Sequence, residues 1–416
     1  MTTESPQAIE RIPANFLSNP YGLFERLRAE GRACQVVMPH GAKVWMVTRY
    51  DDVRSLLDDP RISKDGRRMD EMYVRNSGVA VGESESIDTG FDDVLSSHML
   101  NADPPLHTRL RAQLSKAFTP SAMRRRAPRI EQIVDELLDA MDDKSTVDLV
   151  SAFNVPLPLI AICEIFGIPE KDRHDIERWS TSLIGSGHPA EEVAEAGRQF
   201  TEYTNALIEA RRADPTDDLV SELVRISDND PGRLSHEEMV ANIFVVLAAG
   251  LDTPMRQLGV AVYTLLTHPD ALAELQADPS LIPAAVDELM RFDGTVATAS
   301  FRFAVEDIPL GDVTIPAGEM VLLSLASANR DGAHFDEPDR LNLHRDQLGN
   351  LALGHGQHYC IGAHLAKQEL VIGLTRLIAR FPDLRLAVDP HELRWEDGNL
   401  LRCLIKLPVL ISDKDR

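Results

Sequence analysis

The sequence has few cysteines, no long hydrophobic run and little positive charge. Its four cysteines are far apart along the 416 residues: Cys34, Cys163, Cys360 and Cys403. Disulfide frameworks and iron–sulfur clusters need clustered cysteines, so this spacing predicts neither. The longest uninterrupted apolar run, residues 243–251, is far shorter than a membrane-spanning helix, and the polar N-terminus lacks the apolar stretch of a signal peptide. We therefore expect a cytoplasmic protein that does not enter a membrane.

Basic residues are outnumbered by acidic ones, 43 to 66, which gives a formal net charge of −23. Nucleic acid and anionic membranes are poor partners for such a surface. One segment, residues 107–129, contains no acid and carries Arg109, Arg111, Lys116, Arg124, Arg125, Arg126 and Arg129. This basic segment is a candidate contact for an acidic protein or an anionic cofactor; the alternative is a solvated helix face.

Hydrophobic periodicity predicts a fold that is mainly α with a minor β region. Helices are expected over residues 21–30, 51–57, 129–141, 170–183, 191–212, 235–266 and 363–374. Short strands are expected over 43–48 and within 301–325, and a loop over 76–90. No linker or internal repeat divides the chain, so we expect a single domain over residues 1–416.

Residues 351–362 form a loop with several glycines that presents one cysteine, Cys360. Gly354, Gly356 and Gly362 permit backbone conformations that other residues reach only with strain. A helix is expected directly after the loop, and its dipole would favour a thiolate, which is a good axial ligand for heme iron. Two alternatives are a buried structural cysteine and a zinc site with His355 and His358, although a fourth zinc ligand at suitable spacing is missing.

The predicted helix 235–266 should be long and buried, because apolar residues occur on all of its faces after Ala241. Ser235 and Glu238 form a capping-box pattern at its start. In its middle, Pro254 lacks an N–H and predicts a kinked, partly opened helix. Such a kink beside an acid and a hydroxyl, Asp252 and Thr253, would suit proton delivery; the alternative is a structural kink alone.

The loop resembles the heme-ligand loop of the cytochrome P450 family, Phe-Gly-x-Gly-x-His-x-Cys-x-Gly, with Leu353 at the usual Phe. The resemblance implies the P450 fold, with heme b bound through the Cys360 sulfur as the metal ligand and with Gly354 in the heme-binding loop. Residues 249–253 match the family's oxygen-activating motif, Ala/Gly-Gly-x-Asp/Glu-Thr. That match implies that Thr253 and Asp252 are catalytic. It also implies that the long central helix lies over the heme and that Ala249, on this helix, adjoins the heme. Pro254 departs from the usual Thr or Ser.

Two further segments resemble family motifs. His107 and Arg111 lie one helical turn apart and could present two donors to an anion. The resemblance implies that they bind the heme propionates together with Arg302 and His358. Glu288 and Arg291 match the structural Glu-x-x-Arg motif, with Arg340 as its implied third member.

Between these motifs the chain is similar to soluble bacterial members that hydroxylate or epoxidise macrolides and other polyketides in antibiotic biosynthesis. The resemblance implies a monomeric monooxygenase that uses O₂ and receives electrons from a ferredoxin and its reductase, with the ferredoxin docking near residues 107–129. A large apolar substrate is expected against Met99, Leu100, Leu183, Ile184, Val245, Ala248, Val296, Ala297 and Leu401. A peroxide-driven peroxygenase is disfavoured because such members replace the acid–alcohol pair. A heme-based ligand sensor without turnover is the alternative outside enzymes.

Overall fold

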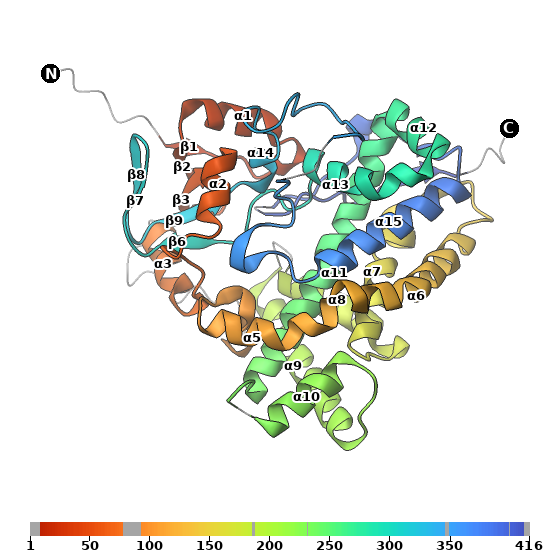
Figure 1. The fold of residues 1–416 in the computed structure, drawn as a ribbon, viewed down its shortest axis with the longest axis horizontal. Helices are drawn as coiled ribbons and strands as arrows, with labels where there is room; N and C mark the ends of the chain where they lie inside the picture. The colour runs from red at the N-terminus through yellow and green to blue at the C-terminus, as the bar shows by residue number, and fades with distance from the viewer. Residues whose placement is uncertain are drawn as a thin grey trace.

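The computed structural model describes residues 9–77, 93–184, 188–230, 232–345, 349–398 and 400–411. Helices dominate it (Figure 1): α1 (Tyr21–Glu30), α2 (Tyr50–Leu56), α3 (Met69–Ser77), α4 (Asp93–Ser96), α5 (Leu106–Leu114), α6 (Pro120–Asp139), α7 (Pro156–Ile165), α8 (Arg173–Ile184), α9 (Ala190–Ala213), α10 (Leu219–Asn229), α11 (His236–Thr267), α12 (Pro269–Ala277), α13 (Ile282–Phe292), α14 (Leu325–Ala328) and α15 (Ala363–Arg380). The prediction of a mainly α protein is confirmed.

Within the described residues, the strands form three sheets. Their bounds are β1 (Glu10–Arg11), β2 (Ala33–Val37), β3 (Lys43–Val47), β4 (Ile62–Ser63), β5 (Thr146–Asp148), β6 (Arg302–Ala304), β7 (Ile308–Leu310), β8 (Val313–Ile315), β9 (Met320–Leu323), β10 (Arg385–Leu386) and β11 (Pro408–Leu410). The largest sheet has the order β1-β2-β3-β9-β6-β4, and the others are β10-β11-β5 and β7-β8. Residues 301–325 supply four of these strands, as expected.

Several predicted boundaries were wrong. Helix α6 begins well before residue 129, because Thr119 caps it by accepting a hydrogen bond from the Ala122 N–H and Pro120 occupies its first position. Residues Glu170–Asp172 form a 3₁₀ turn ahead of α8. The expected loop 76–90 overlaps the end of α3, and its residues 78–90 lie outside the described residues.

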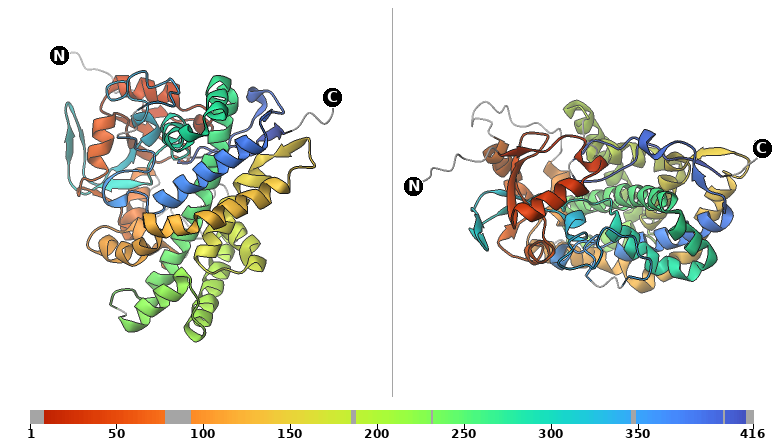
Figure 2. Two further views of the ribbon diagram at one scale, coloured as in Figure 1. Left: turned by 45° about the vertical axis from the view of Figure 1, so that its right-hand side comes forward. Right: turned by 90° about the horizontal axis from the view of Figure 1, so that it is seen from above.

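Helix α11 runs through the middle of the molecule in both views of Figure 2. The predicted capping box is present: the Glu238 N–H donates to Ser235 Oγ at 3.1 Å, and the Ser235 N–H donates to Glu238 Oε2 at 3.0 Å. This helix is long and apolar enough to cross a membrane, but 72% of its apolar window is buried inside the protein. Burial against the surrounding helices accounts for its apolar composition.

The expected opening of this helix at Pro254 is not observed, since α11 is continuous from His236 to Thr267. The Thr253 hydroxyl donates to the Ala249 carbonyl one turn earlier, at 2.8 Å. Gly250 serves the packing of α7: a Cβ at this position would lie 2.9 Å from Ile162 Cδ1. The glycine therefore permits close helix contact.

A buried ion pair joins α13 to the segment that leads into the cysteine loop. Arg291 Nε donates to Glu288 Oε2 at 2.7 Å, and both side chains are inaccessible to solvent. The predicted third member, Arg340, is wrong: its side chain is 68% exposed and pairs with Glu337. Arg345 takes that place, with Nε 3.2 Å from Glu288 Oε1 and a side chain that is only 9% exposed. The Arg340 carbonyl, rather than its side chain, contacts Arg291.

We expect Arg345→Met to lower the free energy of unfolding by about 3 kcal/mol, because it removes one partner from a buried charge network. The matched variant Arg340→Met should change it by less than about 0.5 kcal/mol, since that side chain is exposed. Chemical denaturation of the two purified proteins measures both effects. Equal destabilisation by the two substitutions would contradict this assignment.

Candidate functional site: a cavity beside the cysteine loop

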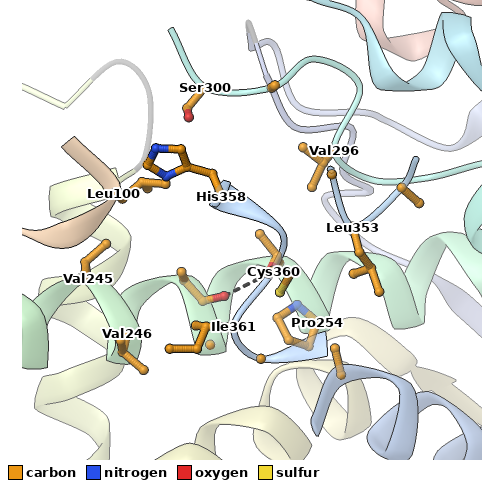
Figure 3. Close-up of a pocket in the computed structure, with 18 of the residues that line it drawn as sticks. Leu100, Val245, Val246, Pro254, Val296, Ser300, Leu353, His358, Cys360 and Ile361 are labelled. Atoms are coloured by element: carbon orange, nitrogen blue, oxygen red, sulfur yellow. Dashed lines mark hydrogen bonds between the residues drawn. The ribbon is translucent and has the colours of Figure 1, made fainter. Parts of the chain in front are cut away.

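One cavity brings most of the predicted site residues together (Figure 3). Its walls come from the cysteine loop, from α11, from α5 and from the segment that leads into β6. In the close-up, Val245, Val246 and Pro254 project from α11, whereas His358, Cys360 and Ile361 project from the loop. The two segments, more than a hundred residues apart in sequence, therefore face the same space.

The loop depends on two glycines in the left-handed backbone region. Gly354 has φ 76° and Gly356 has φ 70°. A Cβ at Gly356 would also lie 2.4 Å from Asp58 Oδ1, so the position excludes any side chain. The Cys360 N–H donates to the Leu353 carbonyl at 3.0 Å and closes the turn. Gly362, in contrast, has φ −84° and needs no glycine conformation, which corrects one expectation.

Burial raises the pKa of the Cys360 thiol, while the Gly362 N–H and the Arg111 guanidinium act in the opposite direction. The Gly362 N–H, just before α15, thus favours the thiolate as expected, but burial of the thiol outweighs this effect on the pKa of Cys360. A bound metal ion removes the thiol proton outright when the sulfur coordinates it. Coordination to the cofactor's iron would therefore hold Cys360 as the thiolate.

A cluster of nitrogen donors lies at one end of the cavity: His107, Arg111, Arg302, His358 and Lys64. The His107 and His358 rings are 4.2 Å apart, and the buried His107 Nε2 has no hydrogen-bond partner among the described residues. Burial and the neighbouring Lys64 lower the pKa of His358 to about 2, and burial lowers the pKa of Arg302 to about 10. This surplus of donors would suit a bound anion. The two propionate carboxylates of a heme would supply that negative charge.

Lys64 is the member of this cluster that sequence reasoning missed. It belongs to no motif considered above, and its side chain is only 2% exposed. A signal was available, since only eight of the 43 basic residues are lysines and this one directly follows Ile62 and Ser63, which form a short buried strand. Buried lysines are rare and need a partner.

The predicted catalytic pair on α11 divides between two environments. Thr253 and Ala249 line the cavity. Asp252 is buried beside it and pairs with Arg256, whose Nη2 is 2.8 Å from Asp252 Oδ1. The second oxygen, Oδ2, is buried without a hydrogen-bond partner among the described residues. Burial raises the pKa of Asp252, and the Arg256 ion pair opposes that effect.

Four of the nine predicted substrate contacts line the cavity: Met99, Leu100, Val245 and Val296. On α11 it is Ala249, rather than the predicted Ala248, that lines the cavity. Ala248 and Ala297 are fully buried elsewhere, Leu183 belongs to the main core, and Ile184 is 39% exposed. Leu401 forms an isolated antiparallel β-bridge with Val296 but does not line the cavity. Further lining residues that were not predicted include Leu57, Val246, Thr295, Ala299 and Ser300.

The basic segment 107–129 is less positive than its sequence suggests. Arg109 pairs with Glu238 at 2.6 Å, and Arg129 pairs with Glu164 at 2.9 Å. Lys116, Arg124 and Arg125 are exposed. The surface charge of this segment therefore rests mainly on those three residues.

The zinc alternative receives no support from the geometry. Among the described residues, no group of three or more His, Cys, Asp or Glu side chains is arranged to hold a metal ion. His355, His358 and Cys360 do line the same cavity, but they do not converge. A single cysteine with nearby cationic side chains fits a heme better than it fits zinc.

Known proteins resemble the chain over nearly its whole length. A family model for cytochrome P450 matches residues 175–392. Cytochrome P450 107B1 of Saccharopolyspora erythraea is 41% identical over 98% of this chain and 99% of its own. The 6-deoxyerythronolide B hydroxylase of the same organism is 39% identical over 89% of this chain and 91% of its own.

A solved structure, that of the tirandamycin C-bound P450 monooxygenase TamI, is 40% identical, covers 97% of this chain and 100% of its own, and superposes with a TM-score of 0.87. The chain therefore belongs to the cytochrome P450 family, as a P450 monooxygenase whose cofactor is heme b and which is similar to bacterial enzymes that tailor macrolides and polyketides.

Proposed function

We propose that this enzyme inserts one oxygen atom from O₂ into a fairly large, apolar macrolide or polyketide, by hydroxylation or epoxidation. The observation that carries the proposal is the cavity itself, in which one cysteine and a threonine of α11 share a space with mostly apolar walls. The relatives support the substrate class, since one is named for 6-deoxyerythronolide B and another was solved with tirandamycin C.

The chain's own residues have separable roles in this proposal. The Cys360 sulfur holds the heme, and His107, Arg111, Arg302 and His358 bind its propionates. When bound, the heme supplies O₂ activation, which a thiolate ligand promotes by donating electron density. The Thr253 hydroxyl holds a proton in the cavity, and Asp252, released from Arg256, replenishes it from the protein interior. Val245, Val296, Met99 and Leu100 exclude water and orient the substrate.

In this proposal electrons come from a ferredoxin and its reductase, as the resemblance to soluble bacterial P450s implies. We place the docking site at Lys116, Arg124 and Arg125, the exposed cations of the basic segment, where an acidic ferredoxin would find complementary charge. We further infer a monomer that works in the cytoplasm.

Reconstitution tests the function. The purified protein with NADPH, a ferredoxin and its reductase should convert members of a macrolide and polyketide panel into products heavier by one oxygen atom, and ¹⁸O₂ should label them. Product formation with hydrogen peroxide alone, at a higher rate, would favour a peroxygenase. Spin-state shifts with tight-binding ligands, but no product under either condition, would favour a heme-based sensor.

A further inference from the structure

Lys64 lies where two strands bring positive charges opposite each other. It directly follows β4, which pairs antiparallel with β6 in the register Ile62↔Ala304 and Ser63↔Phe303. Continuing this register by one residue places Lys64 opposite Arg302. The two side chains are 2% and 4% exposed, and both line the cavity. Like charges at opposed positions of a sheet repel each other, and burial strengthens that repulsion.

The partners within the protein do not balance this charge. Lys64 Nζ donates to Ser300 Oγ at 2.7 Å, which is a neutral acceptor, and Arg302 Nη1 donates to the Ser300 carbonyl at 2.9 Å. Asp103 is the carboxylate that acts on both cations, but its oxygens accept from the Lys64 N–H and the Ser63 hydroxyl. Burial and Arg302 hold the pKa of Lys64 well below its usual range. One carboxylate thus serves two buried cations, with Arg111 nearby in the same cavity.

The place of Lys64 in the cavity indicates which anion it meets. Its partner Ser300 lies at the same end of the close-up as His358, with the Ser300 hydroxyl directed toward the imidazole ring (Figure 3). His107 and Arg302 belong to the same end. The apolar side chains of Val245, Val246 and Val296, which would face a substrate, lie apart from Ser300 and His358 in the same view.

We propose that Lys64 is a further heme-propionate ligand. Lys64 and Arg302 would bind the same propionate carboxylate, whose negative charge offsets the repulsion between the two cations. The proposal rests on the proposed function, because it assumes heme in this cavity. An ammonium that is desolvated, pre-positioned by Ser300 and opposed to a guanidinium forms a strong charge-assisted hydrogen bond with a carboxylate. Lys64 thereby also neutralises charge next to the heme, which favours the reduced iron.

The test uses holoenzyme variants and two measurements: the rate of heme transfer to apomyoglobin and the heme reduction potential. Lys64→Met keeps the side chain's length and removes its charge. We expect heme loss about tenfold faster or more, as for removal of a charge-assisted hydrogen bond, and a lower reduction potential. Lys64→Arg should restore most of both properties. The control Lys43→Met, at an exposed lysine of β3, should change neither.

Ser300→Ala separates heme binding from a merely structural role. It removes the hydroxyl that positions Lys64 but leaves the ammonium able to bind the propionate, so heme loss should rise, and the potential fall, much less than in Lys64→Met. Heme loss as fast as in Lys64→Met would instead show that the Lys64–Ser300 contact only joins β4 to β6, and would overturn the proposal.

Two other outcomes are equally decisive. Lys64→Met with unchanged heme loss and potential but weaker substrate binding would assign Lys64 to the substrate and overturn the proposal. The carbon monoxide spectrum of each reduced variant keeps this separate from the proposed function. If wild type and Lys64→Met both show a strongly red-shifted Soret band and have the same rate of heme loss and the same reduction potential, only the role of Lys64 is refuted. Absence of this band in wild type refutes the proposed function and this inference together.

Discussion

Replacing Cys360 with alanine is expected to abolish the strongly red-shifted Soret band that the dithionite-reduced protein shows under carbon monoxide. The band requires a thiolate on the iron, and Cys360 is the cysteine of the described residues that lines the cavity. Heme affinity and turnover should each fall by on the order of 100-fold or more, since even residues that only support a metal ligand are worth 10 to 100-fold.

Cys403→Ala is the matched control. This cysteine is also buried, at 6% exposed, but its sulfur contacts the Leu404 carbonyl and does not line the cavity. Burial raises the pKa of its thiol to about 12, so it is a structural cysteine. We expect this variant to keep the red-shifted band and its turnover. Retention of the band in Cys360→Ala would refute thiolate ligation by this residue.

Removing the Thr253 hydroxyl is expected to separate electron consumption from product formation. Thr253→Val keeps the shape of the side chain but removes the hydroxyl, which in the structure donates to the Ala249 carbonyl within the cavity wall. Because positioned proton donors contribute about 10² to 10⁴-fold, product per NADPH consumed should fall at least tenfold. NADPH oxidation continues in that case and yields hydrogen peroxide or water.

Thr253→Ser, which retains a hydroxyl, is expected to preserve most of the product yield. Substrate affinity, measured from the spin-state shift, should change little in either variant, because the hydroxyl acts on protons rather than on the apolar substrate. Equal product yield from the valine and serine variants would contradict a proton-holding role for Thr253. A large loss of affinity in both would indicate that the residue mainly shapes the cavity.

Much of the candidate site could be predicted because it is encoded in short segments. Cys360 lies in a loop where Gly354 and Gly356 have positive φ, and such a loop leaves a local trace in sequence. The pairing of Glu288 with Arg291 follows from their separation of three residues on one helix. The capping box at Ser235 and Glu238 is equally local.

The substrate wall could be predicted only in part, because it depends on the rotation of each helix. Val245, Val246 and Ala249 face the cavity, whereas Ala248 on the same helix is fully buried against other elements. Because α11 has apolar residues on every face, its sequence does not show which face lines the cavity. Packing against other helices and against an apolar ligand requires the same residue types.

The sequence by itself determined the helical class of this protein, its cysteine loop and the acid–alcohol pair, because backbone conformation and neighbours along a helix depend on nearby residues. Only the tertiary structure decided that Arg345 rather than Arg340 completes the buried ion pair, and that Lys64 opposes Arg302 at the cavity. The physical reason is that the Arg345–Glu288 pair joins residues 57 apart and that Lys64 and Arg302 are 238 apart. At such separations, charge in the sequence does not distinguish a solvated side chain from a desolvated one.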